Sequence, residues 1–189
     1  QLTIFSVTLY LHRSQAHRGV DFHPVLAHFF RFWTWLTTSM ITREWAAIHR
    51  KHHAKCETEE DPHSPMHKGI KTVFWRGVEL YREARADRES IEKYGKGCPD
   101  DWIERKVYTP HATLGPTLLL FISLLWEVTL ALPNGWWAFR DEALIGLKIS
   151  AWSNLPIEEP CVWMAVTFTT IIVYEVIKIW KALGRGALA

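Results

Sequence analysis

The run ATLGPTLLLFISLLWEVTLAL, residues 112–132, contains 21 residues and a single charge, Glu127. At about 1.5 Å per residue, a helix of this length crosses a hydrocarbon core of about 30 Å. We predict a membrane span here and a second one in the run PCVWMAVTFTTIIVYEVIKIW, residues 160–180. In the second run Glu175 and Lys178 lie near the end, where a long side chain can reach the interface. The predicted fold is all-α, an integral membrane helical bundle with a cytosolic histidine-rich region.

Three other segments complete the predicted layout. Residues 24–42 are apolar and aromatic but carry His28 and Arg31, which allows either a tilted span or a helix lying in the interface. Residues 1–11 are too short to cross a membrane alone, and we expect them to be the cytosolic end of a longer helix. Residues 43–111 hold 14 of the 22 Lys and Arg, so the positive-inside rule places them in the cytosol.

The composition narrows the class of protein. The chain has 189 residues, a net charge of +2, 11 Trp and 10 His. This balance excludes a disordered, collagen-like or nucleic-acid-coating chain. Trp favours membrane interfaces and His is a common metal ligand, so together they indicate a membrane metalloprotein. The three cysteines lack a CxxC spacing, which indicates neither a disulfide framework nor a thiolate zinc site and favours a reducing compartment.

Five histidines occur in two tight groups, HRSQAH at residues 12–17 and HRKHH at residues 49–53. On an α-helix the second spacing places all three of its rings on one face, where they can grip a metal. His12 and His17 differ by five residues, or about 500° of α-helical rotation, and therefore point about 140° apart. We expect these two to serve two metals more easily than one. Zinc is an alternative, but five imidazoles without a thiolate fit iron at least as well.

The two histidine groups and the residues around them form a longer motif that is specific for one family of proteins. HRSQAHR at 12–18, REWAAIHRKHH at 43–53 and TEEDPHSP at 58–65 resemble the membrane acyl-CoA or fatty-acid desaturases, in particular the bacterial delta-9 type. The resemblance covers roughly residues 1–115. It implies a di-iron centre at the cytosolic face that uses O2 to remove hydrogen from a fatty acyl chain.

The same resemblance assigns roles to single residues. It implies that five histidines are iron ligands, namely His12, His17, His49, His52 and His53. Asp61 and His63 match the tail of the second motif and take a supporting role rather than a ligating one. Outside these motifs, His23, His28, His67 and His111 taken singly are expected to be hydrogen-bonding or amphipathic residues.

The resemblance also implies partners and a location. We expect a fatty acyl thioester as substrate, membrane lipid around the chain, and an electron donor of the cytochrome, ferredoxin or rubredoxin type. Nucleic acid is not expected. The location implied is the bacterial cytoplasmic membrane, with the histidine motifs on the cytosolic side. Arg50, Lys51 and Lys55 are candidate contacts for the phosphates of the thioester, or else solvated surface charges. Residues 76–95 are expected to form one solvated helix that ends at Gly95.

One feature departs from the desaturases. Members of the family carry a third histidine motif near the C-terminus, whereas no His follows His111 here. Five imidazoles are too few donors for two irons. We therefore expect a partial or incomplete version, which is a piece of a longer protein, a site completed by another chain, or a fold without catalysis. The alternative function is a non-catalytic membrane subunit or scaffold of a larger complex.

After about Glu127 a different pattern begins, so we predict a desaturase-like region at 1–126 and a C-terminal membrane segment at 127–189. The stretches ALIGLKIS at 143–150 and NLPIEEP at 154–160 weakly resemble the small membrane lycopene cyclases. On that resemblance Glu158 and Glu159 form an acid pair that protonates a polyene. Alternatively, the two carboxylates favour the positive end of a helix dipole.

Overall fold

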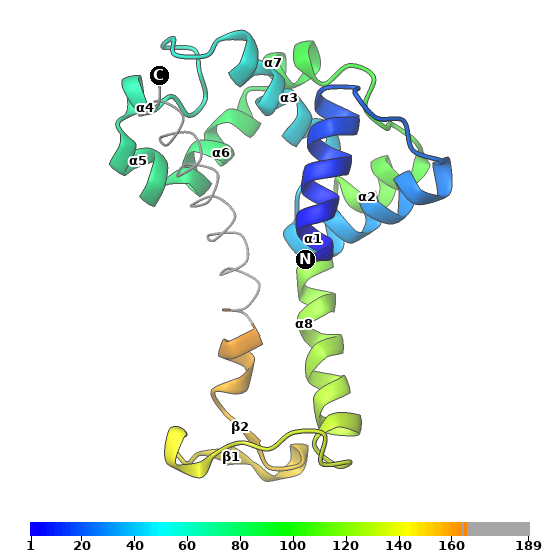
Figure 1. Ribbon diagram of the computed structural model, residues 1–189, viewed down its shortest axis with the longest axis vertical. Coiled ribbons are helices and arrows are strands. Elements are labelled where there is room, and N and C mark those ends of the chain that lie inside the picture. The colour runs from blue at the N-terminus through cyan, green and yellow to red at the C-terminus, as the bar shows by residue number, and fades with distance from the viewer. Residues whose placement is uncertain (164, 166–189) are drawn as a thin grey trace. The chain divides into compact units, whose positions relative to one another are not determined.

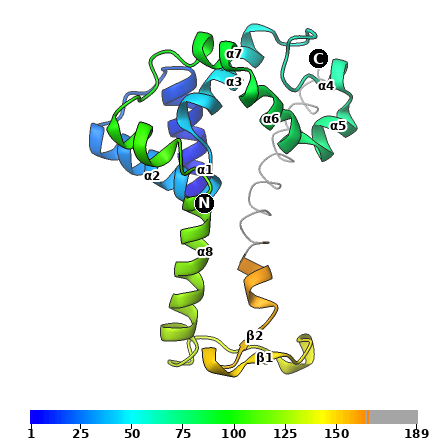
Figure 2. The same ribbon diagram turned by 180° about the vertical axis from the view of Figure 1, so that it is seen from behind.

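The computed structural model describes residues 1–163 and residue 165, and these are mostly helical (Figure 1 and Figure 2). The contacts divide the chain into two compact units, Gln1–Thr113 and Leu114–Ala189. The first unit holds both histidine groups and the second holds the long apolar helix. The all-α prediction is confirmed for the described residues, where the strands are only two residues long.

The N-terminal segment is a helix with unusual hydrogen bonding. α1 (Leu2–Phe5) continues directly into a π-helix, η1 (Ser6–Ala16). In a π-helix each amide bonds to the carbonyl five residues earlier, which makes a wider turn than the α-helix. The amide of His17 extends this pattern by donating to the carbonyl of His12 at 3.0 Å. Tyr10 is buried in η1. This helix packs against the two helices that follow it, at Pro24–Thr38 and Thr42–Ala54.

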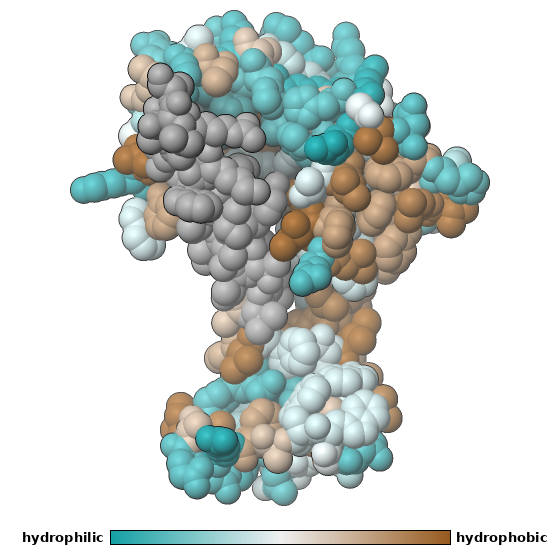
Figure 3. Space-filling view, viewed as in Figure 1, coloured by the Kyte–Doolittle hydropathy of each residue, from teal (hydrophilic) through white to brown (hydrophobic). Residues whose placement is uncertain are grey.

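α2 (Pro24–Thr38) is the helix for which the sequence leaves open a tilted span or a position in the interface. Pro24 begins the helix, His23 caps it, and Ser39 ends it in the left-handed conformation. Its 15 residues extend about 22 Å, less than the hydrocarbon core of about 30 Å. Hydrophobic residues gather over this part of the first unit in Figure 3, and the exposed ones on α2 are Val25, Leu26, Phe29 and Phe32. The length and this apolar face favour a helix lying in the interface.

α3 (Thr42–Ala54) carries the second histidine group and is the central helix of the first unit. It packs against η1 on one side and against α7 (Arg88–Tyr94) on another. Ala47 and Ile48 of α3 form a small buried cluster with Ile91 of α7. The position of the second histidine group is therefore set by apolar contacts with two helices.

The segment predicted as one solvated helix over residues 76–95 is two helices, so that prediction is wrong. α6 (Gly77–Ala86) ends at Asp87, whose side chain accepts a hydrogen bond from the amide of Ser90 and so begins α7. This N-cap competes with continuation of the helix. α7 packs one face through buried Ile91 and exposes the other, and it ends at Gly95 as predicted. Two short helices precede this pair, α4 (Pro65–Lys68) and α5 (Ile70–Trp75).

The second unit contains the predicted membrane span. α8 (Leu114–Trp126) continues as η3 (Glu127–Ala131), and among the described residues this is the one helix long and apolar enough to cross a membrane. The integral membrane bundle stays a prediction, because the second predicted span, 160–180, lies almost entirely outside the described residues. After η3 come two short 3-10 helices and two short antiparallel strands. In chain order they are η4 (Asp141–Ala143), β1 (Lys148–Ile149), η5 (Ser150–Trp152) and β2 (Leu155–Pro156).

A partly buried charge network, in which Arg31 and Glu104 are buried and Asp101 is half-exposed, ties α2 to η2 (Glu104–Tyr108), the last helix of the first unit. Arg31 is 5% exposed, and its guanidinium lies 2.7 Å from Asp101 and 3.7 Å from Glu104. The same guanidinium lies 5.3 Å from the ring centre of Tyr108, a cation–π distance. A buried carboxylate that loses its only cation is strongly destabilising.

We therefore expect Arg31→Gln to lower the free energy of unfolding by about 3–5 kcal/mol, the cost of breaking a buried ion pair. Arg105→Gln is the matched control, because Arg105 pairs with Asp100 at the surface and such pairs contribute about 0–1 kcal/mol. Denaturant titration in mild detergent measures both. Equal losses in the two variants would contradict the assignment of Arg31 to the core.

Candidate metal centre

Four of the five predicted ligands converge in one place. His12 and His17 come from the end of η1, and His49 and His53 come from α3, one turn apart. One nitrogen from each of the four rings lies within 4.8 Å of the others. The Nε2 atom of His49 is 3.2 Å from Nε2 of His17 and 3.1 Å from Nε2 of His53.

The predicted divergence of His12 and His17 is wrong, since their ring centres are only 4.5 Å apart. That prediction assumed α-helical rotation, whereas η1 is π-helical and a bond joins the amide of His17 to the carbonyl of His12. The wider turn brings residues five apart to the same side. π-helical turns are rare and often occur at functional sites. Which metal, and how many, these two rings serve stays a prediction.

The spacing of these nitrogens fits a shared metal ion. A metal about 2.1 Å from each of two nitrogens holds them roughly 3.0–3.4 Å apart at octahedral to tetrahedral angles. The two Nε2 distances at His49 fall in this range. Burial lowers the pKa of His53, and the neighbouring His17 and His52 lower it further. A lowered pKa keeps the imidazole neutral, which is the form that binds metals.

His52 stays beside the other rings of the second group, 5.5 Å from the ring centre of His53, but belongs to a separate group of possible ligands. Its ring centre is 6.5 Å from that of His49, and its Nδ1 lies 2.8 Å from Oδ1 of Asp61. The ring of His63 stacks on it at 4.4 Å. His52 and Asp61 form a second small group of possible ligands together with the exposed Cys56. The five histidines thus divide into four and one.

Asp61 organises the loop that follows α3. Its carboxylate is fully buried and accepts bonds from His52 and from the amides of Glu57 and His63. Burial alone raises its pKa, but the hydrogen bonds from His52 and the two amides outweigh it and lower the pKa below the ordinary value. The carboxylate therefore stays charged beside His52. A carboxylate on the second ring nitrogen is the usual support of a metal-binding histidine.

Sequence reasoning missed one contact of the cluster, and the phosphate contacts that it offered as one alternative stay a prediction. The indole of Trp45 stacks on His49 with ring centres 4.8 Å apart and planes 12° apart. The i, i+4 spacing of these two residues was the signal that could have found it. Lys51 pairs with Asp87 and Lys55 with Glu60, while Arg50 donates only to backbone carbonyls. The predicted phosphate contacts are therefore engaged within the protein.

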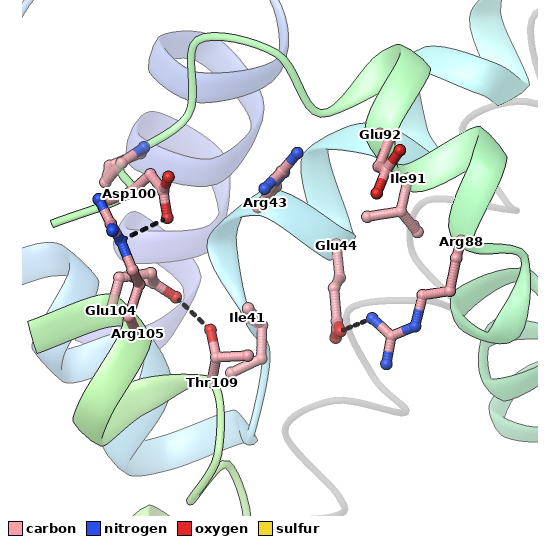
Figure 4. A pocket seen from close by; sticks show the side chains of 11 residues that line it. Ile41, Arg43, Glu44, Arg88, Ile91, Glu92, Asp100, Glu104, Arg105 and Thr109 are labelled. Atoms are coloured by element: carbon pink, nitrogen blue, oxygen red, sulfur yellow. Dashed lines mark hydrogen bonds and ion pairs between the residues drawn. The ribbon is translucent and has the colours of Figure 1, made fainter. Parts of the chain in front are cut away.

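A pocket of about 290 Å³ lies near the beginning of α3, away from the histidines (Figure 4). Seven of its eleven lining residues are charged, and they include Arg43 and Glu44 of α3, Arg88 of α7 and Arg105 of η2. Burial raises the pKa of Glu44, while Arg85 and Arg88 oppose the shift. A cavity with this lining does not suit an alkyl chain.

The predicted acid pair lies in the second unit. Glu158 accepts a hydrogen bond from the amide of Ile145, and the side chain of Glu159 is buried. Glu127, in the apolar helix, is also buried and accepts bonds from the indoles of Trp137 and Trp163. The two predicted acids thus have different surroundings. Glu158 accepts from a backbone amide, and Glu159 is buried.

Comparison with known proteins finds several desaturases. The chain is 41% identical over 59 residues to the probable chloroplastic lipid desaturase ADS3.2 of Arabidopsis thaliana, covering 31% of this chain and 16% of that protein. It is 31% identical over 127 residues to the delta-9 desaturase-like 4 protein of the same plant, covering 67% of this chain and 39% of the relative. It is 34% identical over 62 residues to the icosanoyl-CoA 5-desaturase of Limnanthes douglasii, covering 33% of this chain and 17% of the relative.

These matches are partial, because the chain spans less than half the length of the curated relatives it matches. No family model and no solved structure matches the chain. The similarities support the desaturase family for the part of the chain that they cover. The resemblance of the C-terminal part to lycopene cyclases stays a prediction.

The contact between Asp61 and His52 leads to a prediction. Asp61→Asn replaces one acceptor oxygen by an amide donor, so the side chain can no longer serve His52 and both backbone amides. Loss of such a supporting carboxylate typically weakens metal binding 10–100-fold. We expect a loss of about this size in a Co²⁺ titration of the metal-free chain, followed by optical absorption. Glu60→Gln, which alters an exposed neighbouring acid paired with Lys55, is the control and should leave the affinity unchanged. Equal affinities in all three proteins would remove the supporting role.

Proposed function

We propose that this chain is a fatty-acyl desaturase module that binds iron through the five histidines, His12, His17, His49, His52 and His53. The observation that carries the proposal is the convergence of four imidazoles from two distant segments, with nitrogens within 4.8 Å of one another. The similarity to desaturases over 127 residues supports the reaction class. The fit of the nitrogen spacing to a metal ion supports the cofactor.

In this proposal the residues of the site have different roles. Bound iron supplies, with O2, the oxidising power that removes hydrogen from an unactivated methylene, which no side chain can supply. The imidazoles of η1 and α3 bind the metal. The carboxylate of Asp61 accepts the Nδ1–H of His52, which leaves Nε2 of that ring free to bind the metal. Trp45 packs on His49 and fixes the plane of its ring.

In the overall reaction, the two hydrogens of the acyl chain leave with O2, two electrons and two protons as two molecules of water. A fatty acyl thioester, a membrane setting and an external electron donor are therefore part of the proposal. Five imidazoles do not complete two iron sites. We propose that donors outside the two histidine segments complete them, which makes the described site a partial one.

The test combines metal content with product. Purified in mild detergent without a metal-binding tag, the chain should contain iron by elemental analysis, and its expression should raise unsaturated fatty acids in a host cell. His49→Ala should remove both, because His49 contacts the other rings of the cluster.

His111→Ala is the matched control, since His111 lies outside the cluster and its contact with Trp35 uses the backbone carbonyl. It should retain iron and product. Iron in the wild-type chain without any product would favour the alternative of a non-catalytic membrane subunit. A wild-type chain without iron, or a His49→Ala variant that keeps it, would contradict the metal centre itself.

A further inference from the structure

Arg50 joins three parts of the first unit by hydrogen bonds to carbonyls. From α3, its Nε donates to the carbonyl of Ala16 at 3.0 Å and its Nη2 to that of Gln15 at 2.6 Å. Its Nη1 donates to the carbonyls of Tyr94 at 2.6 Å and Lys96 at 2.9 Å. Four of the five N–H bonds of this guanidinium are thus engaged by main-chain oxygens.

The acceptors are helix ends, which need such a partner. Gln15 and Ala16 are the last residues of η1, and Tyr94 is the last residue of α7. The carbonyls of a helix's last turn receive no hydrogen bond from an N–H of their own helix, so they need another donor. A cation at that position also complements the helix dipole. Ala16 directly precedes His17. The guanidinium therefore fixes the end of η1, and with it His17, against the helix that carries His49.

A second arginine reaches the same turn from the other histidine segment. Nη2 of Arg18 donates to the carbonyl of Lys96 at 2.9 Å, so this oxygen accepts from both arginines. Gly97 follows with φ +76°, and a Cβ there would lie 2.1 Å from Nη2 of Arg18. A Cβ on Gly95 would lie 2.5 Å from the carbonyl oxygen of Ile91. The turn at residues 94–97 is therefore shaped for close approach.

We propose that Arg50 is a positioning residue for the histidine cluster, and that the turn at 94–97 is the anchor to which both histidine segments are tied. The role rests on the proposed metal centre. It needs the planar fork of arginine, because one side chain must reach four carbonyls in two directions. Lysine offers a point charge without that fork.

The test compares Arg50→Lys with Lys51→Gln in the full chain. Lys51 is the matched control, since it is the next residue of α3 and its ammonium pairs with Asp87 and Ser90 instead of the end of η1. In a Co²⁺ titration of the metal-free chain we expect Arg50→Lys to weaken binding about 10–100-fold, as for other supporting contacts. Lys51→Gln should remain near the wild-type affinity.

Hydrogen exchange without metal separates this role from general stability. In Arg50→Lys, the amides of residues 17–19 should exchange faster than in the wild type, while those of α8 keep their rates. Arg18→Gln is a second variant that should shift affinity and exchange in the same direction by a smaller amount, and it serves if Arg50→Lys does not fold. Unchanged affinity and exchange in the arginine variants would overturn the proposal.

The two proposals fail in different ways. A wild-type chain that does not bind Co²⁺ contradicts the metal centre. Exchange at residues 17–19 then still tests the tie made by Arg50. Wild-type binding together with normal binding by Arg50→Lys supports the metal centre and overturns the positioning role.

Discussion

The candidate metal centre depends on the contact between the imidazoles of His17 and His49, which lie 32 positions apart in the chain with their Nε2 atoms 3.2 Å apart. The two nitrogens form a hydrogen bond when one of them carries a proton and the other accepts it. Burial and the neighbouring rings of His17 and His52 lower the pKa of His53. The surrounding helices hold the rings together, because α3 packs on η1 and α7 at once.

The π-helical form of η1 is the second requirement. An α-helix would turn His12 and His17 to different sides, and only one of them could meet α3. The i→i+5 bond between these two residues brings their rings within 4.5 Å. π-helices are rare and occur mostly as single turns inside α-helices, so one of this length needs tertiary support. Here the support comes from buried Tyr10 and Leu11 and from the guanidinium of Arg50 at the end of the helix.

Much of this arrangement can be predicted from sequence, and the reasons for the remainder are physical. The long apolar helix within residues 112–132 follows from its length and composition, and the spacing of His49 and His53 is that of neighbours on one helix face. The π-helix does not, because hydrogen-bond register leaves no mark in side-chain pattern. Arg50 was equally hidden, since its acceptors are main-chain carbonyls that every residue possesses. The break at Asp87 carried a signal, an Asp three residues before Ser90, but its neighbours have strong helix propensity.

The division of the five histidines into four and one makes the two groups chemically unlike. The four-histidine group offers neutral donors only, so an ion bound there keeps its full positive charge. His52 lies against the buried charge of Asp61, which would partly offset the charge of an ion at that position. Two metals in such surroundings would differ in Lewis acidity even if they were the same element. The asymmetry originates in one residue, Asp61, whose buried carboxylate also holds the loop after α3 in place.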